Sequence, residues 1–325
     1  MKLRLLYHGH CFDGVASAAV FTRFYRATRD ATTGESVDVQ YTPLLHRPGS
    51  LFDEEMFDGD ENAIVDFKYS PSDKLTWWFD HHQSAFLTPE DEAHFRADRS
   101  GQKFWDADSK SCTEFIARIA REQFGYEDAG LAPLIEWAHI IDGAFYESPA
   151  QVVELRAPAL QLMQVIENVP DEAFLEKLIR ELAERPLDEV ATGAEVQARL
   201  QPILVRHHET LEVVRRKIAY ARGVVTFDLV DEGHEAFNKF IPYYLHPETT
   251  YSVAVTRTPK RTKISVGSNP WSPRPRTHNI ADICERYGGG GHAVVGAVSY
   301  ATDEVERART TAREIIAELS SDFRE

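Results

Sequence analysis

Short apolar runs alternate with helix-like patterns over about the first 145 residues of the chain. The runs at 3–7, 37–41, 63–67 and 75–79 have the length and apolar character of strands, and 13–24 reads as a helix rich in Ala, Val and Phe. Strands that alternate with helices predict an α/β fold with a parallel, doubly wound sheet. Sheets of this kind bind their ligands at the carboxyl ends of the strands.

A helical pattern follows, from about residue 150 to Gly223. Its apolar residues recur at spacings of three, four and seven, as in Val196, Leu200, Ile203, Leu204, Leu211, Val214 and Ile218. Pro202 predicts a kink or boundary in this pattern, and Gly223 predicts its end. The pattern indicates a helical connector between two domains, although helices docked on one core would show the same spacing.

The remainder of the chain is rich in strand-like runs, "VVTFDLV", "YSVAVTR" and "TKISVGSN", and closes with a charged helical stretch at 302–319. The sequence therefore predicts three parts. These are an N-terminal α/β domain at 1–150, a helical connector at 151–222 and a smaller α/β domain at 223–325.

Composition narrows the class of protein. The 325 residues are 43% hydrophobic, which suffices for real cores, and they contain no apolar run of about 18 residues that would enter a membrane. The three scattered cysteines, Cys11, Cys112 and Cys284, argue against a disulfide framework, and the N-terminus lacks a signal-peptide pattern, so we expect a cytoplasmic protein. A net charge of −16 opposes a nonspecific nucleic-acid coat but not a phosphate-processing enzyme, because bound cations can supply positive potential locally.

Polar side chains with the chemistry of metal ligands gather in four places, three of them at the ends of predicted strands. They are His8, His10, Cys11 and Asp13 in "YHGHCFDG", then Asp66, then Asp80-His81-His82, and finally His139 and Asp142. Imidazoles and carboxylates without paired cysteines suit a hydrolytic Mn²⁺, Zn²⁺ or Mg²⁺ site better than a structural zinc. Two such ions about 3.5–4 Å apart can activate a water and clamp a phosphoryl group.

Each of these residues alone has an ordinary interpretation. An aspartate after a strand is most often a turn residue or a helix cap, and a single histidine in a loop is most often a structural residue. An Asp-His-His triple directly after a buried strand is much rarer by chance. Taken together, the four clusters favour a metal site.

The order of these motifs resembles that of the DHH phosphoesterase superfamily. A His/Asp-Gly loop precedes a helix, and a lone Asp, the DHH tripeptide and a further Asp follow. The late stretch "RYGGGGHAVVGAVSY" is similar to the Gly-rich signature of the DHH-associated domain in RecJ-like exonucleases and in oligoribonucleases that act on nano-RNA. The resemblance implies an N-terminal DHH catalytic domain with a doubly wound sheet and a C-terminal substrate-binding domain.

The resemblance also implies roles for the individual residues. Asp66 resembles the carboxylate that bridges two metals, Asp13 and Asp142 resemble terminal ligands, and His81 resembles the imidazole ligand. His82 resembles the catalytic histidine that faces the phosphate, and Asp80 would orient its neighbours. His139 receives no role.

The first motif departs from the pattern of the family. Many members have His-x-Asp-x-Asp-Gly, whereas here Cys11 stands two residues before Asp13. The histidine is one position out of register in either direction, and we favour His8, which directly follows the strand, over His10. Cys11 is either a thiolate ligand, which would favour softer ions, or a small buried residue beside a site that has lost a ligand.

Two features of the C-terminal part predict contact with a substrate. "GGGGH" at Gly288, Gly289, Gly290, Gly291 and His292 is interpreted as a loop that brings backbone donors to a phosphate, with a flexible turn as the alternative. The stretch 249–281 has no acidic residue and six basic ones, among them Arg261, Arg274 and Arg276, with Trp271 available for base stacking. A solvated basic face is the alternative. The expected picture is a cleft, with metals on one wall and this basic, Gly-rich wall opposite.

The predicted function is a phosphoesterase that hydrolyses short oligonucleotides or small nucleotides with two Mn²⁺ ions, for which Mg²⁺, Co²⁺ or Zn²⁺ are alternatives. A nucleotide-binding regulatory protein with a degenerate metal site is one competing hypothesis, supported by Cys11. Hydrolysis of inorganic polyphosphate is another, and "GGGGH" counts against it. The sequence leaves open the exact substrate, the cleavage polarity, the native metal and the oligomeric state, with a homodimer as one option.

Overall fold

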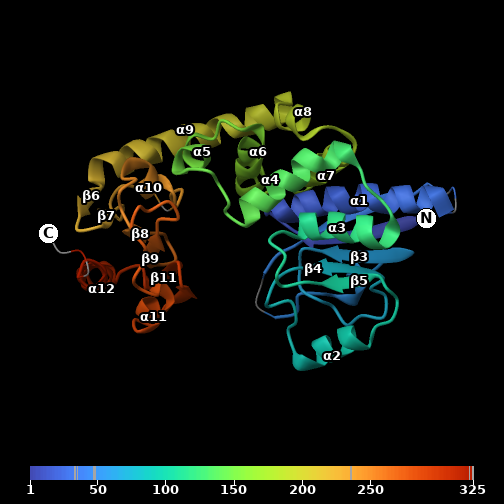
Figure 1. Cartoon of the computed structure of the whole chain (residues 1–325), viewed down its shortest axis with the longest axis horizontal. Coiled ribbons are helices and arrows are strands. Elements are labelled where there is room, and N and C mark those ends of the chain that lie inside the picture. The colour runs from blue at the N-terminus through green and yellow to red at the C-terminus, as the bar shows by residue number, and fades with distance from the viewer. Residues whose placement is uncertain (33, 35, 47–48, 235, 322, 324–325) are drawn as a thin grey trace. The chain divides into compact units, whose positions relative to one another are not determined.

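The structure is a computed structural model that describes residues 1–32, 34, 36–46, 49–234, 236–321 and 323. The chain divides into two compact units (Figure 1). Unit 1 comprises Met1–Tyr146 and Arg156–Gln201, and unit 2 comprises Glu147–Leu155 and Pro202–Glu325. Within the described part of the chain, every helix is either too short or too polar to cross a bilayer.

Unit 1 contains a five-stranded sheet in which every pair of neighbouring strands is parallel. In spatial order the strands are β2 (Asp38–Leu44), β1 (Lys2–His8), β3 (Glu61–Val65), β4 (Trp77–Asp80) and β5 (Lys103–Trp105). The four strands predicted in this part of the chain are present, and β5, a strand of three residues, was not predicted because its apolar run is too short to stand out. The predicted α/β fold with a parallel sheet is confirmed.

Helices cover both faces of this sheet. The helices of unit 1 are α1 (Phe12–Thr32), α2 (Pro89–Ala97), α3 (Cys112–Phe124), α4 (Ala132–Asp142), α6 (Pro158–Asn168), α7 (Glu172–Glu184) and α8 (Leu187–Ala191), with short 3-10 turns at Glu54–Met56 and Ala129–Leu131. Figure 1 shows α1 and α3 over one face and α2 on the opposite side of the strands. The rings of Trp77 and Phe79 meet Phe21 of α1, whereas Trp78 meets Phe95 of α2. Burial on both faces explains why the run Trp77–Phe79 is apolar without alternation.

The predicted connector at 151–222 is distributed over both units. Helix α5 (Pro149–Glu154) lies entirely in a segment assigned to unit 2, whereas α6 to α8 belong to unit 1. Helix α9 (Ala194–Lys217) runs through Pro202 without ending, and the limit between the two units falls immediately before this proline.

The end of the helical region was predicted wrongly. Helix α9 ends at Lys217, and β6 (Ala219–Ala221) then pairs with β7 (Val224–Asp228). A tight turn with positive φ at Arg222 (47°) and Gly223 (72°) joins these two strands. Gly223 therefore marks a turn between two strands, and its conformational freedom serves that turn.

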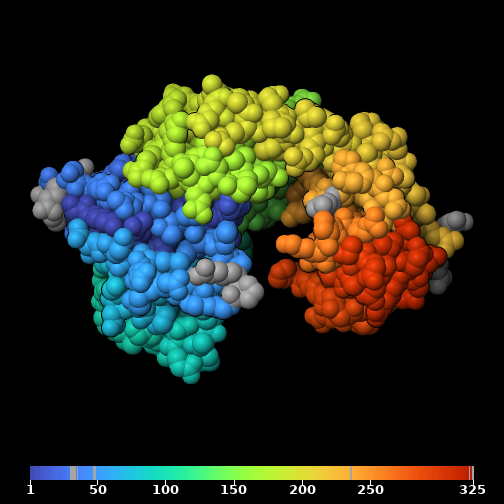
Figure 2. Space-filling view, turned by 180° about the vertical axis from the view of Figure 1, so that it is seen from behind, coloured from blue at the N-terminus to red at the C-terminus, as the bar shows by residue number. Residues whose placement is uncertain are grey.

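Unit 2 contains a mixed six-stranded sheet in the order β10-β11-β9-β8-β7-β6. Its other strands are β8 (Tyr251–Arg257), β9 (Thr262–Ser268), β10 (Gly290–His292) and β11 (Val295–Tyr300), and its other helices are α10 (Ile241–Leu245), α11 (Ile280–Glu285) and α12 (Val305–Leu319). The amphipathic helix α12 buries Ile315 and Leu319 in a core with Val253 and Ile264 of the sheet. Red atoms of the C-terminal part of the chain, which includes α12, form much of the face of unit 2 in Figure 2.

Candidate metal centre

The sheet of unit 1 brings the ends of three strands to one edge. The parallel register aligns Tyr7 of β1 with Val65 of β3, and Val65 with Phe79 of β4. The residues that follow these positions, His8, Asp66 and Asp80, therefore leave the sheet at the same level. Ligand atoms lie within 4.8 Å of one another in three groups, which are His8–Cys11–Asp66, Asp66–His81–His82 and Asp13–His81–Asp142.

Asp66 links two of these groups and is nearly fully buried, with 1% of its surface exposed. Its backbone has a φ of 57°, in the left-handed region, and its amide donates to the carbonyl of Phe79 at 2.9 Å. Its Oδ2 lies 3.3 Å from Nδ1 of His8, and its Oδ1 lies 3.4 Å from Nε2 of His81. A strained backbone that turns a buried carboxylate toward histidines is typical of a functional site.

Asp13 has a structural role as well as a place in the cluster. Its Oδ2 accepts a hydrogen bond from the amide of Cys112 (2.6 Å), and its Oδ1 accepts from the amide and the hydroxyl of Thr113 (3.2 and 2.7 Å). Asp13 thus satisfies free amides at the start of α3. Burial and the charges of Asp66 and Asp142 raise the pKa of Asp13 to about 8. The ordinary interpretation, a helix cap, and the metal-ligand interpretation apply to the same residue.

His81 stands at the centre of the carboxylates. Its Nδ1 lies 3.1 Å from the carbonyl of Ser109, which fixes a tautomer with the proton on Nδ1 and leaves Nε2 facing Asp66, Asp142 and Asp13 at 3.4, 3.5 and 3.7 Å. Burial disfavours the charged ring, but the carboxylates outweigh burial and raise the pKa of His81 to about 10. A proton on Nε2 therefore balances part of the negative charge wherever no cation does so.

Three unpartnered atoms show that these residues fit a cation. Among the described residues, three atoms of this cluster are buried without a hydrogen-bond partner: Asp66 Oδ1, Asp80 Oδ2 and His81 Nε2. Asp66 Oδ1 and His81 Nε2 lie 3.4 Å apart. Buried polar atoms are normally paired, so such a concentration of unpaired ones is typical of a cation-binding site. Carboxylate oxygens and an imidazole nitrogen are donors that Mn²⁺, Mg²⁺ and Zn²⁺ accept. The site therefore fits the predicted divalent metal.

His82 differs from His81 in partner and in exposure. Its Nδ1 lies 2.7 Å from Oδ1 of Asp80, an oxygen that also accepts from the amides of both histidines at 2.9 and 3.3 Å. Burial lowers the pKa of His82, but the hydrogen bond to Asp80 outweighs burial and raises the pKa above its ordinary value. The His82 side chain is 39% exposed against 9% for His81, so His82 is the more accessible of the two. The orienting role that the resemblance implies for Asp80 stays a prediction.

Sequence reasoning missed His46, whose ring stacks on Phe67 at 4.7 Å and lies 5.2 Å from the ring of His8. It follows β2, beyond the strands that carry the other ligands, and no motif surrounds it. His10, the alternative to His8, belongs to none of the three groups and has a left-handed φ of 57°. The structure thus brings together His8, Cys11, Asp13, Asp66, His81, His82 and Asp142.

Gly14 allows the start of α1 to approach the end of β1. A Cβ atom at this position would lie 2.1 Å from the backbone oxygen of His8. We therefore expect Gly14→Ala to lower the free energy of unfolding by about 1–3 kcal/mol, the usual cost of overpacking. Urea unfolding of the full chain measures this change. Gly290→Ala, at a glycine with open space around it, is the control and should change stability by less than Gly14→Ala does.

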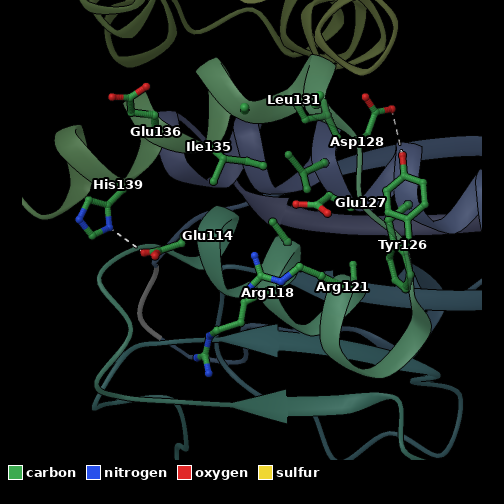
Figure 3. A pocket seen from close by; sticks show the side chains of 16 residues that line it. Glu114, Arg118, Arg121, Tyr126, Glu127, Asp128, Leu131, Ile135, Glu136 and His139 are labelled. Atoms are coloured by element: carbon green, nitrogen blue, oxygen red, sulfur yellow. Dashed lines mark hydrogen bonds and ion pairs between the residues drawn. The ribbon is translucent and has the colours of Figure 1, made fainter.

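His139 lies outside the metal cluster. Its Nδ1 pairs with Oε2 of Glu114 at 2.7 Å, and its ring stacks on Phe145. Figure 3 shows this pair at the rim of a cavity of about 550 Å³ between α1, α3 and α4, where Arg118 and Arg121 also lie. None of the candidate metal ligands lines this cavity, so it is a separate feature of unit 1.

The predicted substrate-binding residues of unit 2 have mostly structural environments. Gly290–His292 form β10 at the edge of the sheet, so the predicted loop, like the alternative flexible turn, is wrong for these residues. Gly291 lets β10 approach β11 closely, because a Cβ there would lie 2.3 Å from the oxygen of Val295. A Cβ at Gly289, just before the strand, would lie 2.2 Å from the oxygen of Ala297. Gly288, with a φ of 74°, precedes this strand.

The three candidate arginines differ in their partners. Arg276 donates through Nη1 to the carbonyls of His278 and Ala293 at 2.7 and 2.6 Å, so it braces its own loop. The guanidinium of Arg274 lies over the ring of Phe323. Arg261 lies in the turn between β8 and β9, where its carbonyl accepts from the amide of Thr258. A substrate contact by these residues stays a prediction.

Comparisons with known proteins give similarity in structure and none in sequence. The sequence matches no protein-family model, and no curated protein matches it either. Among solved structures, a pGpG-specific phosphodiesterase from Vibrio cholerae superposes with a TM-score of 0.69 at 19% identity and covers 99% of this chain and 100% of its own.

Two further solved structures extend this similarity. The DHH domain of a member of the s1p family of ribosomal proteins has a TM-score of 0.57 at 12% identity, over 98% of this chain and 87% of its own. RecJ from Thermus thermophilus in complex with Mg²⁺ has a TM-score of 0.51 at 13% identity, over 98% of this chain and 50% of its own. Similarity at these identities concerns the fold. The chain therefore has the fold of the DHH superfamily, as its motifs predict.

Proposed function

We propose that the chain is a divalent-metal-dependent phosphoesterase that hydrolyses short oligonucleotides or small nucleotides. The observation that carries this proposal is the convergence of Asp13, Asp66, Asp142 and His81 around buried atoms without hydrogen-bond partners. Several buried acids in so small a space need their negative charge balanced, and divalent cations would balance it. Asp66, which belongs to two ligand groups, would hold both of two cations.

The residues around the cations would have two kinds of role, holding the cations and stabilising charge on the substrate. Bound divalent cations would supply an activated water and neutralise the phosphoryl oxygens. His8, Asp13, His81 and Asp142 would hold them in place. His82, held at Nδ1 by Asp80, has Nε2 available for a phosphoryl oxygen, and its raised pKa favours the protonated ring that stabilises negative charge on a leaving group.

The substrate class is proposed from two sources. The Vibrio protein with this fold is named as a pGpG-specific phosphodiesterase, so a nucleotide substrate is found on the same fold. The stretch 249–281 lacks acidic residues in a chain with a net charge of −16, which suits a partner that carries phosphates. A short substrate, a Mn²⁺ cofactor, a cytoplasmic location and a homodimer stay predictions.

Comparison of substrates of different length tests this proposal. Metal-stripped protein reloaded with Mn²⁺ receives a 5′-phosphorylated dinucleotide, a long 5′-labelled single strand or inorganic polyphosphate. We expect release of mononucleotides, with a higher kcat/KM for the dinucleotide. A higher value for the long strand or for polyphosphate would overturn the choice of short substrates. Binding of the dinucleotide without any turnover would favour the regulatory alternative.

A weaker effect is expected at the residue that orients His82. Asp80→Asn should reduce kcat by about 10- to 100-fold, the usual cost of losing a group that positions a catalytic or ligating histidine. Because Asp80 Oδ1 accepts from His82 Nδ1, an asparagine that turns its amide toward the ring would favour the wrong tautomer. Steady-state kinetics with the dinucleotide measure the change. A kcat equal to that of the wild type would refute the orienting role.

A further inference from the structure

The first and the third of the three ligand groups in the metal centre differ in the atoms that they offer to a cation. His8, Cys11 and Asp66 offer a nitrogen, a sulfur and an oxygen within 4.8 Å of one another, whereas Asp13, His81 and Asp142 offer one nitrogen and two oxygens. Both groups can supply two negative charges, from the Cys11 thiolate and Asp66 in the first and from two carboxylates in the second. Each can therefore balance one divalent cation.

We propose that the two cation positions are unequal, and that Cys11 is a ligand in the first. The position beside His8, Cys11 and Asp66 would be a mixed nitrogen, sulfur and oxygen site that favours a softer ion such as Co²⁺ or Zn²⁺. The position beside Asp13, His81 and Asp142 would accept the harder Mn²⁺ or Mg²⁺. This inference rests on the proposed function for the presence of cations, and it adds their chemical class.

Cys11 is the cysteine placed for this role. It lies in the loop between β1 and α1, half-buried, directly before the helix that carries Asp13. Cys112 is fully buried and its thiol points to the carbonyl of Phe79 at 3.5 Å, and Cys284 belongs to the core of unit 2. Cys112 and Cys284 are absent from the groups of candidate ligands found among the described residues.

The buried carboxylate beside Cys11 supplies the second observation. Oδ2 of Asp66 lies 3.3 Å from Nδ1 of His8, and the residue is only 1% exposed. A cation bound there would contact this oxygen and the sulfur together. When the metal–sulfur bond forms, the thiol releases its proton to solvent and the thiolate supplies the electron pair.

Cobalt spectroscopy tests the proposal without reference to activity. The reduced, metal-stripped full chain is titrated with Co²⁺ at fixed pH, and absorption is followed in the near ultraviolet, where thiolate-to-cobalt charge transfer occurs. We expect a charge-transfer band for the wild type and none for Cys11→Ser. We also expect Co²⁺ affinity at one position to fall at least about tenfold in Cys11→Ser, since even groups that only support a ligand contribute 10- to 100-fold.

Two control variants identify the sulfur. Cys112→Ala and Cys284→Ala should keep the band, and their far-ultraviolet circular dichroism should match that of the wild type. A band that persists in Cys11→Ser, or one that disappears in Cys112→Ala, would overturn the assignment. Binding of Co²⁺ by the wild type without a charge-transfer band would overturn it as well.

Competition between metals extends the test to preference. Wild type and Cys11→Asp are each dialysed against equal concentrations of Zn²⁺ and Mn²⁺, and the retained metals are counted. Most protein sites favour Zn²⁺, so the change between variants is the informative quantity. We expect the ratio of Zn²⁺ to Mn²⁺ to fall several-fold in Cys11→Asp, and an unchanged ratio would contradict the proposal. A charge-transfer band in a protein that hydrolyses no substrate would support the Cys11 assignment and refute the proposed function. Hydrolysis by a protein that shows no band would support the proposed function and refute the Cys11 assignment.

Discussion

Asp66→Asn is expected to abolish phosphoesterase activity, with a loss of at least about 1,000-fold in kcat/KM. The variant keeps the shape of the side chain but loses the charge that would hold both cations. Metal ions contribute several kcal/mol of transition-state stabilisation, and about 4 kcal/mol corresponds to three orders of magnitude in rate. Asparagine tolerates the left-handed φ of 57° at this position, so the backbone should keep its conformation. Steady-state hydrolysis of the dinucleotide measures the loss.

Thermal unfolding distinguishes a lost metal from a lost fold. Mn²⁺ at about 100 times its Kd should stabilise the wild type by about 2.7 kcal/mol, and the variant by clearly less. Asp73→Asn, at an exposed aspartate of the same unit, is the matched control and should behave as the wild type. An Asp66→Asn protein that retains full activity would show that the observed hydrolysis has another source or that Asp66 is not a ligand.

His82→Ala is expected to reduce kcat by about 100- to 10,000-fold, the range of a general acid or base. Its Nδ1 is committed to Asp80 and its side chain is 39% exposed, so it is the histidine that a substrate can reach. The content of bound metal, measured on the purified variant, should equal that of the wild type. This combination of low kcat and full metal content is what a residue that faces the phosphate predicts.

The amount of bound metal in His82→Ala also distinguishes two roles of His82, a residue that faces the phosphate and a metal ligand. Its ligand atom lies in one group with Asp66 and His81, so a ligand role is the competing interpretation. Loss of one metal ion per chain in His82→Ala would support the ligand role and contradict the role of a residue that faces the phosphate. His139→Ala is the control, because this histidine pairs with Glu114 away from the cluster, and most of the activity should remain.

The parallel sheet and its ligand edge could be predicted from the sequence because both faces of the sheet are buried. Uninterrupted apolar runs such as Trp77–Phe79 require cover on both sides, and a polar residue directly after such a run lies at a strand end. Asp66 and His81, which follow β3 and β4, therefore came together as their positions predicted, and Asp142 joins them from the end of α4. Parallel pairing makes this inference possible, since every strand ends at the same edge.

Other features depend on contacts between residues far apart in the sequence. The hydrogen bonds from α3 to Asp13 join residues 99 and 100 positions apart, and no local pattern encodes them. His46 approaches His8 only because β2 and β1 are neighbours. Strand β10 consists of Gly290–His292, whose glycines suggest a loop, and only its partner β11 makes it a strand. Short strands of low intrinsic propensity are set by tertiary pairing.

Titration of metal into the stripped protein tests the central claim most directly. The chain is treated exhaustively with a chelator and desalted, Mn²⁺ is added in steps, and release of mononucleotide from a 5′-phosphorylated dinucleotide is followed at each step. We expect no release before metal is added and a rate that rises with added Mn²⁺ and then saturates. A full rate in the chelated protein, with metal analysis showing none bound, would contradict a metal centre built on Asp13, Asp66, His81 and Asp142.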